Sequence, residues 1–96
     1  MQTLTLSAQT QVSVSGSVVD DATGESLPGV NIRVKDKVIG TITLPDGKFS
    51  LTVNGAPPIT LIFSYVGYKS QEIEVNQSNL SNLDIRMEES VIFGQE

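Results

Sequence analysis

The sequence contains no cysteine and no histidine, and these two absences remove several classes of site at once. Without cysteine no disulfide can form, so the fold must be held by its own core. Zinc, haem and iron–sulfur centres take most of their ligands from Cys and His side chains, and we therefore expect no site of these kinds. A catalytic serine is usually activated by a histidine base, which this chain lacks.

Cations are scarce as well. Six Lys and Arg stand against eleven Asp and Glu, which gives a formal net charge of −5. A nucleic-acid-binding surface needs clustered cations, and an anionic membrane surface repels an acidic domain. No apolar run approaches the ~20 residues of a membrane-spanning helix. We therefore expect no nucleic-acid partner and no direct membrane insertion by this chain, and we attribute the charge to solubility.

Aromatic residues are few and Trp is absent, whereas Val, Ile and Thr are plentiful. These β-branched residues suit the pleated, half-buried surface of a sheet. Period-two hydrophobic patterns dominate the 96 residues and recur at spacings of about 8–12 residues, which predicts one all-β domain of about seven strands, a β-sandwich or a barrel. The residues expected to be largely buried are Val14, Val18, Val30, Ile32, Phe49, Leu51, Leu61, Phe63, Ile73 and Ile85.

Three segments carry more specific structural predictions. Residues 59–66 form the most apolar stretch, and we expect a central strand that is buried on much of both faces. Residues 76–82 are polar and are expected to be a loop, followed by a last strand from Leu83. Asp20, at the start of a polar turn, is expected to accept hydrogen bonds from nearby backbone N–H groups.

The carboxylates of Asp20, Asp21 and Glu25 are the closest approach to a metal site. Oxygen ligands at such spacing suit a hard cation, but the spacing of an EF-hand loop is absent. Turn chemistry is the favoured interpretation. Asp20 and Asp21 are kept as candidate contacts for a ligand or partner, and no metal, cofactor or catalytic residue is predicted.

Phe63, Tyr65 and Tyr68 surround Gly67 and raise the question of a sugar-stacking platform. Alternation places Phe63 and Tyr65 on one face, which favours core packing over ligand stacking. Tyr68 follows the glycine and is expected to be partly exposed, so it is the third candidate contact. No Ser-x-x-Lys motif occurs and no pair of carboxylates is set up for glycoside hydrolysis, so we predict that the chain is not an enzyme.

Four stretches, residues 14–24, 27–34, 40–51 and 61–68, form an ordered set that resembles a known family. They are similar to the carboxypeptidase-regulatory-like domain, and more narrowly to its copy at the N-terminus of SusC-like TonB-dependent outer-membrane receptors. The resemblance covers about residues 12–88 and implies a Greek-key, transthyretin-like (prealbumin-like) sandwich.

The shared motifs consist mostly of turn and core residues, such as Gly16 for close packing and Gly47 for a turn. Leu44 departs from the family pattern, which often has Asp there. If that Asp helps to hold a cation in some relatives, this chain has lost the ligand.

The resemblance implies a non-catalytic accessory domain on the periplasmic side of the Gram-negative outer membrane, within a larger nutrient receptor. Its role would be spacing, docking or regulation, with periplasmic proteins or the receptor's own plug domain as partners. The TonB system and a SusD-like lipoprotein are implied only for the full-length parent. Two alternatives stay open: a carbohydrate-binding module, which needs exposed aromatic residues on one surface, and a stalk or adhesin repeat, which needs tandem copies.

The expected organisation has three parts. Residues 1–11 are an N-terminal arm or the remnant of a signal peptide, and residues 12–89 are the sandwich. Residues 90–96 are the start of a linker toward a plug and barrel that this sequence does not contain. The chain is then either an excised N-terminal piece of a receptor or a free domain.

Overall fold

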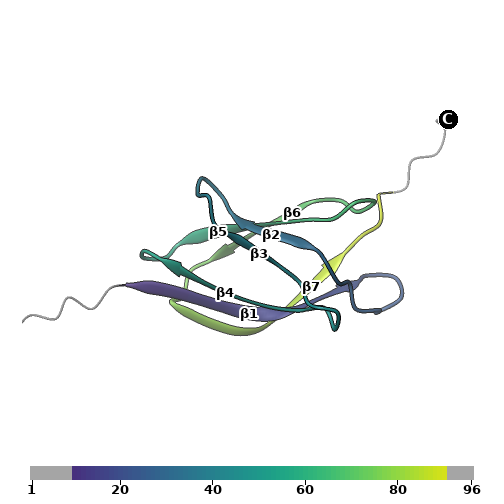
Figure 1. The fold of residues 1–96 in the computed structure, drawn as a ribbon, viewed down its shortest axis with the longest axis horizontal. Helices are drawn as coiled ribbons and strands as arrows, with labels where there is room; N and C mark the ends of the chain where they lie inside the picture. The colour runs from purple at the N-terminus through teal and green to yellow at the C-terminus, as the bar shows by residue number, and fades with distance from the viewer. Residues whose placement is uncertain (1–9, 91–96) are drawn as a thin grey trace, which may run out of the picture.

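The computed structural model describes residues 10–90, which form seven β-strands and no helix (Figure 1). The predicted all-β sandwich of seven strands is confirmed, while its Greek-key, transthyretin-like character stays a prediction. Apart from residues 10, 11 and 90, the predicted arm and linker lie outside the described range. The strands are β1 (Gln11–Asp20), β2 (Asn31–Val34), β3 (Gly40–Ile42), β4 (Lys48–Asn54), β5 (Ile59–Ser64), β6 (Gln71–Val75) and β7 (Asn79–Met87). None of the described residues belongs to a helix long and apolar enough to cross a membrane.

The strands form a three-stranded sheet in the order β4-β1-β7 and a four-stranded sheet in the order β3-β2-β5-β6. Every pairing is antiparallel except that of β1 with β7, which is parallel. The first and last strands therefore lie side by side and run in the same direction. As a result the chain enters the sheet at Gln11 and leaves it at Met87, at the opposite end (Figure 1).

The core lies between the two sheets. Phe49 of one sheet meets Phe63 of the other edge to face, with ring centroids 5.6 Å apart and planes at 73°. All residues that the sequence predicted to be buried are buried except Ile73, which is half-buried. Ile73 lies on β6, an edge strand with a neighbour on one side only, so its side chain packs against the core without being covered.

β5 is an interior strand of the four-stranded sheet, as expected, but it ends at Ser64 and only one of its faces is fully buried. Ile59, Leu61 and Phe63 point into the core, whereas the alternate residues are half-buried. The expectation of burial on both faces was wrong because no further layer of the described chain covers the outer face of this sheet.

β7 begins at Asn79, inside the segment that was expected to be a loop. Between Leu80 and Leu83 it advances three residues while β1 advances two, and Asn82 adopts a left-handed φ of 62° at this β-bulge. Because the bulge shifts the hydrophobic alternation by one residue, the sequence pattern did not reveal the first half of the strand. A Cβ on Gly16 would lie 2.1 Å from the carbonyl oxygen of Leu83, so the close packing expected at this glycine is confirmed.

The core assignment predicts the effect of truncating its largest fully buried side chain. Phe63→Ala should lower the free energy of unfolding by ~3–5 kcal/mol, because it removes a ring that is enclosed on all sides. Val66→Ala is the matched control: Val66 is 95% exposed, and its truncation should change stability by less than about 0.5 kcal/mol. Urea unfolding measures both values, and a loss below about 1 kcal/mol for Phe63→Ala would contradict the assignment.

Candidate functional site

Asp20 carries the one carboxylate that is buried within residues 10–90. It ends β1, and its Oδ1 accepts hydrogen bonds from the backbone N–H groups of Ala22 at 2.8 Å and Thr23 at 2.9 Å. This is the turn chemistry that the sequence predicted. The second oxygen, Oδ2, accepts a hydrogen bond of 2.6 Å from the hydroxyl of Tyr68. Both carboxylate oxygens are therefore satisfied by the protein itself.

Tyr68 lies in the turn between β5 and β6 and reaches Asp20 across 48 residues of sequence. Its half-buried ring lies beside that of Tyr65, with centroids 5.6 Å apart and planes tilted by 34°. Its backbone forms an isolated bridge with Glu89, just after β7. Two of the three candidate contact residues thus meet, and they join the end of β1 to the turn of the other sheet.

The hydrogen bond between Tyr68 and Asp20 perturbs both groups. The Tyr68 hydroxyl, followed by the backbone N–H of Thr23, lowers the pKa of Asp20 below its usual value of 3.8. The bond to Asp20 raises the pKa of Tyr68 to about 12. Both shifts follow from a neutral phenol that donates to an ionised carboxylate. The bond joins the end of β1 to the turn after β5, so the pair is a structural link between the two sheets.

Asp21, the third candidate, is exposed and does not join the pair. Its backbone N–H donates to the carbonyl oxygen of Met87 at 2.9 Å. An open depression of about 340 Å³ lies beside it, lined by Asp21, Ala22, Lys69, Glu88 and Glu89. In the part of the chain that the structure describes, no three His, Cys, Asp or Glu side chains gather in a way that could hold a metal ion.

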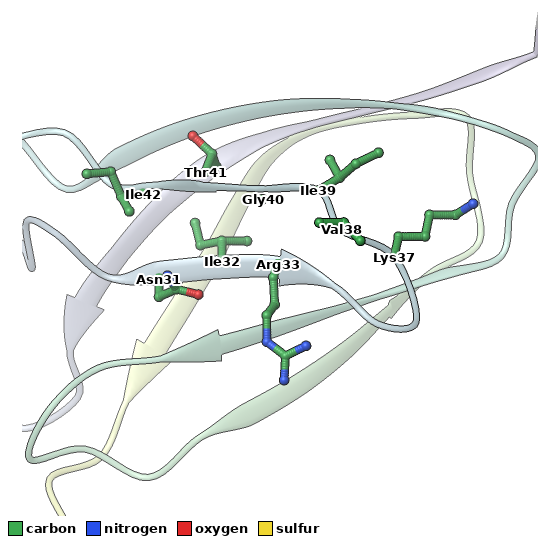
Figure 2. Close-up of a pocket in the computed structure, with 9 residues that line it drawn as sticks. All are labelled: Asn31, Ile32, Arg33, Lys37, Val38, Ile39, Gly40, Thr41 and Ile42. Atoms are coloured by element: carbon green, nitrogen blue, oxygen red, sulfur yellow. The ribbon is translucent and has the colours of Figure 1, made fainter.

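A different surface feature lies at the hairpin of β2 and β3 (Figure 2). A depression of about 570 Å³ is lined by Asn31, Ile32, Arg33, Lys37, Val38, Ile39, Gly40, Thr41 and Ile42. We call residues 38–42 the β3 edge. Its aliphatic side chains are open to solvent: Val38 is fully exposed, Ile42 is 56% exposed and Ile39 is 38% exposed.

Sequence reasoning did not single out the β3 edge, because it named Val38, Ile39 and Ile42 neither among the residues expected to be buried nor among the candidate contacts. Ile42 alternates correctly, but it pairs with Asn31 on the outer face of the sheet rather than the inner one. Val38 and Ile39 precede β3 at the end of the hairpin connection, where polar residues are usual. Two adjacent aliphatic residues in such a connection are the signal that would have revealed the surface.

The sequence matches one protein family. Residues 14–95 match the family described as CarboxypepD_reg-like domain. The TonB-dependent receptor P3 of Formosa agariphila is 40% identical over 86 residues, which are 84% of this chain and 8% of the receptor. The TonB-dependent receptor SusC of Bacteroides thetaiotaomicron is 42% identical over 65 residues, which are 68% of this chain and 6% of that receptor. The chain therefore spans only a small part of the length of these relatives.

Two solved structures have a similar fold. One is a candidate membrane-associated protein of unknown function from Bacteroides fragilis, with a TM-score of 0.61 and 19% identity over 88% of this chain and 30% of that one. The other is a candidate carbohydrate-binding protein from Bacteroides uniformis, with a TM-score of 0.56 and 16% identity over 79% of this chain and 40% of that one. At these identities the likeness concerns the fold alone.

The link between Asp20 and Tyr68 predicts how stability depends on pH. Because folding lowers the pKa of Asp20, its contribution is present above the unfolded value of 3.8 and is lost as the pH falls through the lower folded pKa. Tyr68→Phe keeps the ring and removes the hydroxyl, so part of this contribution is already absent at neutral pH. Urea unfolding from about pH 2 to pH 7 should therefore show a shallower acid loss for Tyr68→Phe than for the wild type.

Two further comparisons make this test specific. The contribution of Tyr68, whose folded pKa is about 12, is present below its unfolded value of 10.0 and is lost as the pH rises through 12. Tyr68→Phe should abolish that alkaline loss. Tyr65→Phe, the matched control on the neighbouring ring, should keep the acid dependence of the wild type. Identical acid profiles for wild type and Tyr68→Phe would show that the bond does not stabilise the fold.

The turn interpretation of the acidic residues predicts that folding is independent of metal. The oxygens of Asp20 already accept hydrogen bonds from Ala22, Thr23 and Tyr68, and no second carboxylate among the described residues joins it in a metal-type cluster. Thermal unfolding with a chelator and with added calcium should give the same midpoint, for the wild type and for Asp21→Asn alike. A calcium-dependent rise of several degrees in the wild type would overturn this interpretation.

Proposed function

Because the chain belongs to the family of CarboxypepD_reg-like domains, we propose that it is a non-catalytic accessory domain of a SusC-like, TonB-dependent outer-membrane receptor. One observation carries the proposal: the match covers most of this chain but only 8% or 6% of the receptors. That is the relation expected of one module in a much longer protein. In this proposal the domain has the Greek-key, transthyretin-like fold of its family and lies on the periplasmic side of the membrane.

The arrangement of β1 and β7 supports a role as a spacer. Since they are parallel neighbours, the chain enters at one end of the sandwich and leaves at the other (Figure 1). The 10 residues of β1 span roughly 30 Å at ~3.3 Å per residue. The domain would hold the segments before and after it apart by about this length.

Protein contacts are the second part of the proposed role. The partners are periplasmic proteins or the receptor's own plug domain, and the TonB system and a SusD-like lipoprotein act on the whole receptor. The alternative of a carbohydrate-binding module finds no support in the described aromatic residues. Phe49 and Phe63 are buried, and the half-buried rings of Tyr65 and Tyr68 lie against each other, whereas sugar stacking needs exposed ring faces.

The proposal predicts the effect of removing the domain from a full-length parent receptor. Deletion of residues 12–88 should impair uptake of the nutrient or its regulation, while the receptor still reaches the outer membrane. Uptake by cells and receptor abundance in the outer-membrane fraction measure the two parts. A replacement by a Gly/Ser linker of about 30 residues, whose mean reach is close to that of β1, separates spacing from docking, because it restores only a spacing role.

Two results would contradict the proposed function. One is unchanged uptake and unchanged regulation after the deletion. The other is tight binding of a glycan to the 96-residue chain in calorimetry, which would favour a carbohydrate-binding module.

A further inference from the structure

The backbone of β3 is paired on one side only, with β2. On that side the N–H of Val34 donates to Ile39 and the N–H of Thr43 donates to Val30. In an antiparallel pair such residues alternate with residues whose N–H and C=O groups point away from the neighbour. Gly40 and Ile42 occupy these alternate positions, so their backbone groups face outward from the sheet.

β3 is only three residues long, but it lacks the charges and the bulge that keep the other edge strands from pairing. Exposed charges or a bulge at an edge prevent another strand from adding to it. The remaining edges of the two sheets carry such features: Glu72 and Glu74 on β6, Lys48 on β4, and Asp84, Arg86 and the bulge at Asn82 on β7. β3 itself contains no charged residue, and the exposed side chains of the β3 edge are aliphatic.

Two cations stand beside this edge. Both line the apolar depression: Arg33 projects from β2 to the same side as Ile42, and Lys37 lies in the hairpin turn (Figure 2). Among residues 10–90 neither forms an ion pair, and nor does Lys48 on β4, whereas Lys35, Lys69 and Arg86 all do. On a chain with a net charge of −5, an apolar edge flanked by two such cations is complementary to a segment that is both aliphatic and acidic.

We propose that the β3 edge binds an extended segment of a partner protein, which adds a fifth strand to the four-stranded sheet. Its backbone would pair with the outward groups of Gly40 and Ile42. On the face that Ile42 and Arg33 share, its aliphatic side chains would cover Val38 and Ile42, and carboxylates at the positions between and beyond these would lie near Arg33 and Lys37. This inference rests on the proposed function, because it names the surface and the partner chemistry of the protein contact.

A second copy of the chain fits this surface less well. Two copies that met edge to edge would bring the cations of one β3 edge close to those of the other. Like charges in apposition weaken association, so the observations favour a different, acidic partner.

The test uses a synthetic eight-residue Val/Glu peptide, Val-Ser-Glu-Ser-Val-Ser-Glu-Ser, which places its Val and Glu side chains on one face of an extended strand. A Val/Lys peptide, with Lys in place of Glu, is its charge control. The isotope-labelled 96-residue chain is titrated with each and followed by NMR. The Val/Glu peptide should shift the resonances of residues 33–42 and slow hydrogen exchange at the amides of Gly40 and Ile42. The Val/Lys peptide should bind at least about fivefold more weakly. Equal binding of both peptides, or shifts elsewhere, would overturn the proposal.

Two variants test the backbone and the charge separately. Ile42→Pro removes an outward N–H that β2 does not use, so it should keep the fold and abolish binding. Lys37→Glu should weaken binding of the Val/Glu peptide by about fivefold to tenfold. Its matched control is Lys48→Glu on β4, which changes the net charge equally and should have little effect. Far-UV circular dichroism and the melting temperature establish that each variant is folded.

The same Ile42→Pro change in the full-length parent distinguishes this inference from the proposed function. Impaired uptake or regulation, like that of the deletion, supports the β3 edge as the working surface. Normal uptake and regulation with Ile42→Pro, when the deletion is defective, would leave the accessory role standing and overturn this inference. Sedimentation that shows a wild-type dimer and an Ile42→Pro monomer would also overturn it, because the occupant would then be a second copy.

Discussion

The fold depends on the close approach of β1 and β7 at Gly16. β1 is the middle strand of its sheet and holds β4 on one side and β7 on the other. Any side chain at residue 16 would overlap the backbone of Leu83, so glycine at this position allows the last strand to join the first. Because the two strands are parallel, the same contact also sets the entry and exit of the chain at opposite ends, which suits a module placed in line between two others.

The link between Asp20 and Tyr68 secures the exit end. A buried carboxylate is costly unless hydrogen bonds satisfy it, and Asp20 receives three. These bonds connect the end of β1, its turn and the turn after β5, while Glu89 pairs with the backbone of Tyr68. Asp20 and Tyr68, which the sequence offered as candidate contacts for a ligand or partner, thus hold the two sheets together where the chain leaves the sandwich. Their polarity has a structural cause.

Local patterns in the sequence predicted most of the strands but not how they meet. Alternation along Val12, Val14 and Val18 identifies β1 and its buried face, since that information lies within a few residues. The parallel pairing of β1 with β7, the bulge at Asn82 and the bond from Tyr68 to Asp20 join segments far apart in the chain. No local period reports such contacts. The β3 edge was missed for a related reason, because hydrophobicity alone does not tell which face of a strand is covered.

The two proposed roles use different sides of the molecule and so do not compete. β7 lies next to β6, where the side chain of Gln71 donates to the carbonyl oxygen of Arg86, whereas β3 is the opposite edge of the four-stranded sheet. A partner strand on β3 would therefore leave the exit end unobstructed. An exposed aliphatic edge carries a risk of unwanted association in any small domain, and the negative charge of the whole chain limits that risk between copies. Arg33 and Lys37 give the β3 edge a local positive charge on this otherwise acidic chain. This local charge favours an acidic partner segment.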